Sequence, residues 1–222
     1  LTMLKHDQPA NEPMGEAKGI FPGRVVWVWN PDATNENCTL TYNGDGIGDT
    51  NDDGWFLDKN NNQSVIDDML SEVLRSLTST DSDVAAWEAL FKYFNHTKHG
   101  LEDKTYTEGE KIFIKTNATS SWGKGEEWGN ITFNNKKVEN RYYAIAETSP
   151  HLVLSLLRQL INVYGIPQAS ISVGDPMKHL YDHCYEKWHN EFPDVHYIAY
   201  EGGSGREKVV AGSNPSVFYS DK

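Results

Sequence analysis

An alternation of strand-like and helix-like segments in the second half of the chain most constrains what it can fold into. Residues 110–115 and 169–174 are short runs rich in apolar and β-branched residues, the composition of buried strands. Between them, an apolar stripe of helical spacing covers residues 149–164, with Ser149 suited to the N-cap and Pro150 to the first helical position. Strands joined by such helices form βαβ units, which build parallel sheets. The sequence therefore predicts an α/β fold, a mostly parallel sheet flanked by helices and interrupted by long polar loop insertions.

Five further segments extend this pattern along the chain. Residues 24–29, Arg-Val-Val-Trp-Val-Trp, have the composition of a buried strand. Apolar stripes of helical spacing predict one helix over residues 64–77 and a second over residues 84–94. Towards the C-terminus, a helix over residues 177–190 and a strand over residues 195–199 complete the series.

Chain length and the two terminal segments indicate the domain organisation. A chain of 222 residues has room for one domain of ordinary size. We expect an N-terminal arm over residues 1–22, an α/β domain over residues 23–201 and an irregular, Gly/Ser-rich segment over residues 202–222. Because that last segment has no closing element, we expect either a further C-terminal portion of the native chain or a protein partner to complete it.

The charge balance narrows the class of partner. Lys and Arg number 20 against 32 Asp and Glu, which gives a formal net charge of -12. Nucleic acids and anionic membrane surfaces are bound by concentrated basic surface, so we expect neither as a partner. No run of residues approaches the ~20 apolar residues that a membrane span needs.

The cysteines and histidines provide too few candidate ligands for a metal centre. Cys38 and Cys184 are too few for a four-cysteine zinc or iron–sulfur site, and the sequence leaves open whether they pair with each other. His179 and His183 are four residues apart on a predicted helix and would share one face of it, but no third ligand is identifiable. Surface histidines are therefore the favoured interpretation.

Polar residues follow two of the predicted strands at the point where each ends. Lys115 and Asn117 close the first strand, and Gly174 and Asp175 close the second. Because the carboxyl ends of parallel strands meet at one edge of a sheet, where open α/β folds bind ligands, we expect Lys115, Asn117 and Asp175 to converge there. A lysine suits an anion or a carbonyl, an asparagine can orient a ligand, and a glycine allows close backbone approach.

Each of these residues also has a purely structural interpretation. Lys115 can extend along apolar surface to reach solvent, Asn117 can form an Asx turn, and Asp175 can cap the following helix. Arg206 is a further ligand candidate, since it follows the glycine-rich residues 202–205 and could reach an anion at the same edge. No helix follows that segment to make it a phosphate-binding loop.

A long polar loop over residues 31–62 contains the candidate metal site. Within it, oxygen-bearing residues at alternate positions precede Gly54, which fits the opening of a calcium loop. An EF-hand is excluded because Asn60 stands where a bidentate glutamate is needed. Two interpretations remain: a looser calcium site, and a solvated, turn-rich insertion, which the missing glutamate favours. The candidate ligands are Asp45, Asp49, Asn51, Asp53 and Asp58.

Three motifs, in order along the chain, resemble those of a known family. They are Lys115-Thr-Asn117, Thr148-Ser-Pro150 and Val173-Gly-Asp175. Domain-of-unknown-function family 362 has a strand ending in Lys-Pro-Asn, a Thr-x-Pro that opens a helix, and a strand ending in Gly-Asp; here Thr116 replaces the proline. Residues 19–28 resemble the Bacteroidetes-like branch of that family.

The resemblance implies a bacterial, exported protein located in the periplasm, the cell envelope or the extracellular space. It also implies that Lys115, Asn117, Gly174 and Asp175 occupy the family's motif positions. Family members often occur beside ferredoxin-like iron–sulfur modules. This chain contains no such module, so no redox role carries over.

Two functional hypotheses follow. In the first, the chain is an enzyme domain that binds a small anionic or carbonyl ligand at the carboxyl edge of the sheet. In the second, it is a non-catalytic binding or assembly component of an exported or cell-envelope complex. A deep pocket around Lys115 and Asp175 would favour the first, and a flat edge with Lys115 in a structural ion pair would favour the second.

Overall fold

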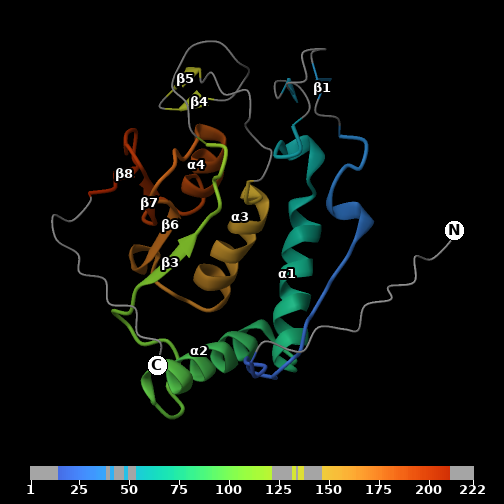
Figure 1. Ribbon diagram of the computed structural model, residues 1–222, viewed down its shortest axis with the longest axis vertical. Coiled ribbons are helices and arrows are strands. Elements are labelled where there is room, and N and C mark those ends of the chain that lie inside the picture. Colours follow the sequence, from blue (N-terminus) through green and yellow to red (C-terminus); the bar gives the residue numbers. More distant parts are fainter. Residues whose placement is uncertain are drawn as a thin grey trace, which may run out of the picture.

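Four parallel strands form the central sheet of the computed structural model, in the order β3–β6–β7–β8 (Figure 1). Their bounds are β3 Ile112–Lys115, β6 Ile171–Asp175, β7 His196–Ala199 and β8 Glu207–Lys208. The structure describes residues 15–38, 41–42, 48–49, 54–121, 132–133, 135–137 and 147–210. The predicted α/β fold with a parallel sheet is confirmed.

Two helices connect the strands and lie side by side on one face of the sheet (Figure 1). The first, α3 (Pro150–Arg158), begins as the sequence predicts, because the Ser149 hydroxyl accepts a hydrogen bond from the Leu152 N–H and Pro150 occupies the first turn. It continues into a π-helical turn, η3 (Gln159–Val163). The second helix, α4 (Asp182–His189), connects β6 to β7.

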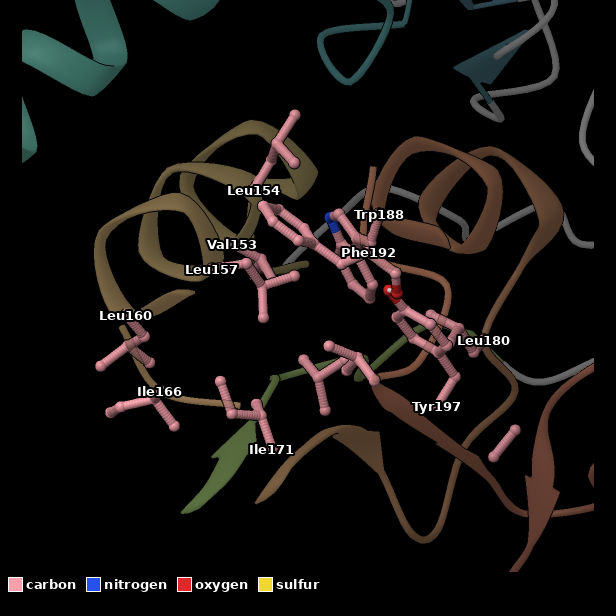
Figure 2. Close-up of a cluster of buried hydrophobic side chains, with 13 residues drawn as sticks. Val153, Leu154, Leu157, Leu160, Ile166, Ile171, Leu180, Trp188, Phe192 and Tyr197 are labelled. Carbon is pink, nitrogen blue, oxygen red and sulfur yellow. Dashed lines mark hydrogen bonds between the residues drawn. The ribbon is translucent and has the colours of Figure 1, made fainter. Parts of the chain in front are cut away.

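The hydrophobic core fills the space between these helices and the sheet (Figure 2). Alternate residues of β6 and β7 point into it, which is why Val173 and Tyr197 are almost completely buried. The Trp188 indole donates to the Pro150 carbonyl at 2.8 Å, so the largest aromatic of α4 is tied to the start of α3. Burial of the apolar surface in this layer holds the two crossover helices against the strands.

Two longer helices flank the α/β unit. They are α1 (Gln63–Thr78) and α2 (Asp83–His99), and both predicted helices are confirmed. Helix α1 packs on the side of α3 that faces away from the sheet, where Arg158 binds Asp67 at 2.7 Å (Figure 1). In the described part of the chain, no helix is long and apolar enough to cross a membrane.

Residues 24–29 are not the buried strand that their composition predicts. They are extended but pair with no strand in the described part of the chain, and they run along α1 (Figure 1). Arg24 fixes the start of the segment by donating to the Ser76 and Leu77 carbonyls at the end of α1. Composition favoured a strand, but the fold places no neighbouring strand beside it.

The helix expected over residues 177–190 begins five residues later, at Asp182. The backbone N–H groups of Met177 and Lys178 donate to Asp175, and that of His179 donates to the Ser121 carbonyl. His179 and His183 therefore do not share one face of a single helix, as the sequence had suggested.

Short elements complete the described chain. The loop over residues 31–62 contains the 3-10 turns η1 (Pro31–Ala33) and η2 (Asp58–Asn60) and the hairpin strands β1 (Thr41–Tyr42) and β2 (Gly48–Asp49). A second hairpin pairs β4 (Thr132–Phe133) with β5 (Lys136–Lys137). The irregular C-terminal segment expected from residue 202 contains the short strand β8, which pairs parallel to β7 after a tight glycine-rich loop.

Candidate functional site

Lys115 and Asp175 form an ion pair at the carboxyl edge of the sheet. Strands β3 and β6 are neighbours, and Lys115 aligns with Gly174 in their register. The Lys115 Nζ lies 3.0 Å from the Asp175 Oδ2 and also donates to the Thr116 carbonyl at 2.7 Å. The predicted convergence of these two strand ends is confirmed.

The two partners differ in exposure. The Asp175 side chain is 8% exposed and that of Lys115 is 53% exposed. Burial alone would raise the pKa of Asp175, but the Met177 N–H, the Lys115 ammonium and the Ala118 N–H together hold it below its ordinary value. The carboxylate is thus a fixed anionic anchor for a lysine that reaches solvent.

Gly174 is required by the packing of the sheet itself. Its φ angle is +149°, and a Cβ at this position would lie 2.1 Å from the Ile198 carbonyl oxygen of β7. Any side chain here would clash with the backbone of the neighbouring strand. The close backbone approach expected from the sequence is therefore made to β7.

Asn117 holds the loop that follows β3. Its backbone N–H donates to the Thr148 hydroxyl at 2.7 Å, and its carbonyl accepts from the Thr148 N–H at 2.8 Å. Its side-chain oxygen accepts from the Thr119 hydroxyl at 2.8 Å, which is a short-range turn interaction. Asn117 lies at the same edge as Lys115, and these backbone contacts tie the loop after β3 to Thr148.

Three residues of this edge were not singled out from the sequence: Ser120, Ser121 and Glu147. The Glu147 carboxylate accepts from the Ser120 N–H at 2.5 Å and from the Ser120 hydroxyl, and its other oxygen accepts from the Ser121 hydroxyl at 3.2 Å. These contacts fasten the loop after β3 to the residues that precede α3. The sequence gives only a weak indication of this cluster, namely two serines shortly after a predicted strand and a glutamate just before the start of a predicted helix.

Arg206 lies away from the Lys115–Asp175 pair, among residues of α4. Its buried guanidinium donates to Asp182 at 2.6 Å and stacks over the Tyr185 ring, 4.2 Å from the centroid. Burial lowers the pKa of Arg206, against the opposing effect of the Asp182 carboxylate. These contacts fasten the glycine-rich loop before β8 onto α4.

The candidate calcium ligands fall mostly outside the described residues. Asp45, Asn51 and Asp53 are among those not described, and of Asp49 only its place in β2 is described. Asp58 lies in η2, where it accepts from His151 Nε2 at 2.9 Å and from the Lys187 ammonium. The residue expected to be a ligand therefore contacts a cation of α4.

No metal-binding cluster is found within the described residues, which contain no group of three His, Cys, Asp or Glu side chains able to hold an ion. His179 is buried between the edge loops, and His183 packs on the Phe56 ring with centroids 4.6 Å apart. Cys38 and Cys184 form no disulfide in this part of the chain.

A hollow lies elsewhere, between α2 and the start of β3. It has a volume of about 620 Å³ and is mostly apolar. The residues that line it include Trp87, Leu90, Phe91, Phe94, Tyr106, Ile112 and Phe113. Lys115 and Asp175 are not among the residues that line it.

Comparison with known proteins returned no match among family models, curated proteins or solved structures.

Proposed function

We propose that the carboxyl edge of the sheet binds a small anionic or carbonyl-bearing ligand through Lys115. The observation that carries this proposal is the geometry of its ammonium group. An ammonium has three N–H donors, and two of those of Lys115 are used by Asp175 and by the Thr116 carbonyl. With half of the side chain exposed, the third donor is available to a ligand from solvent.

The surroundings of the pair support the same assignment. Asp175 is held by the backbone N–H groups of Met177 and Ala118, so it fixes the position of the ammonium without itself reaching solvent. A lysine restrained in this way loses less side-chain entropy when it binds an anion than a freely rotating one. The resemblance to domain-of-unknown-function family 362 adds that the same positions are motif residues in that family.

Calorimetric titration with pyruvate, which carries both a carboxylate and a ketone, and with inorganic phosphate tests this function. The Lys115→Ala variant should lose at least about tenfold in affinity, or about 1.4 kcal/mol. Lys111→Ala is the matched control, because Lys111 lies just before β3 and donates to the Ala169 carbonyl at the far end of the strand. Equal binding by both variants, or no binding by the parent, would contradict the proposal.

A second candidate function is a non-catalytic role in assembly, within an exported or cell-envelope complex of a bacterium. The observation that favours it is that Lys115 does not line the apolar hollow of about 620 Å³ between α2 and β3. Under this alternative the ion pair closes the end of the sheet and binds nothing. Fractionation of the source cells would test the location, with recovery of the protein in the cytoplasmic fraction as the contrary result.

A further inference from the structure

Residues 24–29 have the properties of a strand whose partner is another molecule. Val25, Trp27 and Trp29 are 89%, 80% and 66% exposed, whereas Val26 and Val28 on the other face are partly buried. Large apolar side chains this exposed, side by side on one face, mark interaction surfaces. Tryptophan in particular is enriched where proteins bind one another.

The backbone of the same segment is also unused. Among the residues that the structure describes, the N–H and carbonyl groups of residues 25–29 make no hydrogen bonds. Arg24, at one end, is fixed to the end of α1, and at the other end the Asn30 side chain caps η1. The segment is thus held extended at both ends, with its polar backbone and three apolar side chains open, as strand addition requires.

A matching acceptor exists on the same chain, at the outer edge of β3. This strand pairs with β6 alone among the described elements. The Thr116 N–H donates to the Gly174 carbonyl of β6, so alternate residues turn their backbone groups towards β6, and Phe113 and Lys115 turn theirs to the outer edge. An added strand would find donors and acceptors there.

The apolar hollow of about 620 Å³ lies beside that edge, between α2 and β3. Its wall includes Phe94, which is 50% exposed, and Phe113, which is 49% exposed. Exposed aromatic rings line a hollow next to a strand edge that no described element pairs with, and together they provide both contacts that a strand such as 24–29 needs. One is the backbone ladder, and the other is a site for the tryptophan rings.

We propose that residues 24–29 of one copy of this chain add as a strand to the outer edge of β3 in a second copy, with Trp27 and Trp29 over the hollow between α2 and β3. The charge of Arg24 favours a parallel arrangement, in which Arg24 lies near the opposite charge of Glu110. The opposite arrangement would bring Arg24 to Lys115, two like charges.

The buried area is sufficient for a stable dimer if the exchange is reciprocal. An aromatic side chain buries about 150–250 Å², so the two tryptophans bury roughly 300–500 Å² and the facing hollow a similar amount. Two such contacts per dimer bury roughly 1,200–2,000 Å², which is the size of specific protein interfaces. This inference does not depend on the ligand proposed for Lys115.

Sedimentation over a wide range of protein concentrations tests the inference with three variants. The variant Trp27→Ser/Trp29→Ser in residues 24–29 is called the arm variant, and the variant Phe94→Glu at the hollow is called the groove variant. Each should be monomeric under conditions in which the parent is dimeric. Val84→Ser is the matched control, since Val84 is 44% exposed on the same helix but does not line the hollow, and it should dimerise like the parent. At protein concentrations low enough for the parent to be monomeric, all three should melt close to the parent, because the altered side chains are exposed.

Mixing the arm variant with the groove variant distinguishes exchange from other modes of association. The mixture retains one intact arm and one intact groove, so it should form a heterodimer, weaker than the parent dimer, although each variant alone does not. A parent that stays monomeric at every concentration would overturn the inference. So would an arm variant that associates like the parent, or a groove variant that still dimerises, which would indicate pairing of arm with arm.

Discussion

Lys115 and Asp175 lie 60 residues apart in the sequence, and their side chains meet at 3.0 Å across the ends of two neighbouring parallel strands. The aspartate is buried and bonded to two backbone N–H groups, while the lysine reaches solvent. This asymmetry has measurable consequences for stability, because removing the buried partner should cost more than removing the exposed one.

We predict that Asp175→Ala destabilises the protein by about 2–3 kcal/mol, because it leaves the N–H groups of Met177 and Ala118 without their acceptor. Lys115→Ala should cost no more than about 1 kcal/mol, as is usual for an exposed member of an ion pair. Urea unfolding measures both values, with Asp194→Ala in the exposed turn before β7 as the control. A larger loss for Lys115→Ala than for Asp175→Ala would refute this ordering.

Gly174→Ala should destabilise the protein by more than about 3 kcal/mol or prevent folding, because its Cβ would lie 2.1 Å from the Ile198 carbonyl oxygen. Gly100→Ala is the matched control, at the end of α2. It also has a positive φ, +65°, but no atom lies within 4 Å of its Cβ, so only the backbone cost of about 1–2 kcal/mol applies. Thermal and urea unfolding compare the two, and similar losses would show that the contact between β6 and β7 relaxes easily.

Stability should fall on acidification from neutral pH. Burial lowers the pKa of His183 from 6.5 to about 3 in the folded protein, so the unfolded chain binds more protons between these values. The resulting stability is complete above about pH 6.5 and is lost as the pH falls towards 3. The lowered pKa of Asp175 acts in the same direction, at pH values around and below its ordinary 3.8.

His183→Gln should remove part of the decrease in melting temperature between about pH 7 and about pH 5. His99→Gln, at an exposed histidine of α2, is the control and should leave the decrease unchanged. A pH profile that is the same for His183→Gln and the parent would exclude His183 as a source of the acid sensitivity.

Calcium binding by the acidic loop remains a prediction of the sequence. If the site forms, calcium at about a hundred times its dissociation constant should add about 2.7 kcal/mol to the free energy of unfolding. Asp49→Asn should weaken this effect, because it removes a carboxylate ligand. Unchanged melting in the presence of chelator, together with no co-purifying metal, would identify the loop as a solvated insertion.

The sequence predicts the elements whose signals are local. Ser149 and Pro150 mark the start of α3 because capping and the fixed φ of proline act within one turn. The strands predicted over residues 110–115 and 169–174 are found as β3 and β6. Their ends meet because parallel strands place their carboxyl ends on one edge of the sheet. The Lys115–Asp175 contact could be anticipated for that reason.

Other features depend on which segments meet in space, and the sequence does not encode them locally. The pattern of residues 24–29 reports strand propensity but not whether a neighbouring strand exists. Strand β8 is only two residues long, too short for a periodic signal. The contacts of Arg206 with Asp182 and Tyr185, and of Asp58 with Lys187, join residues from different elements, so no spacing rule predicts them.

The central claim, that Lys115 presents a ligand site at the sheet edge, is tested most directly by mapping backbone amide NMR shifts during titration with pyruvate. The account predicts saturable changes at Thr116, Ala118 and Met177, the amides around the ion pair, and their loss in Lys115→Ala. Amides at the opposite end of the sheet, such as that of Lys111, should not change. No saturable change around the pair, or changes that persist in Lys115→Ala, would contradict it.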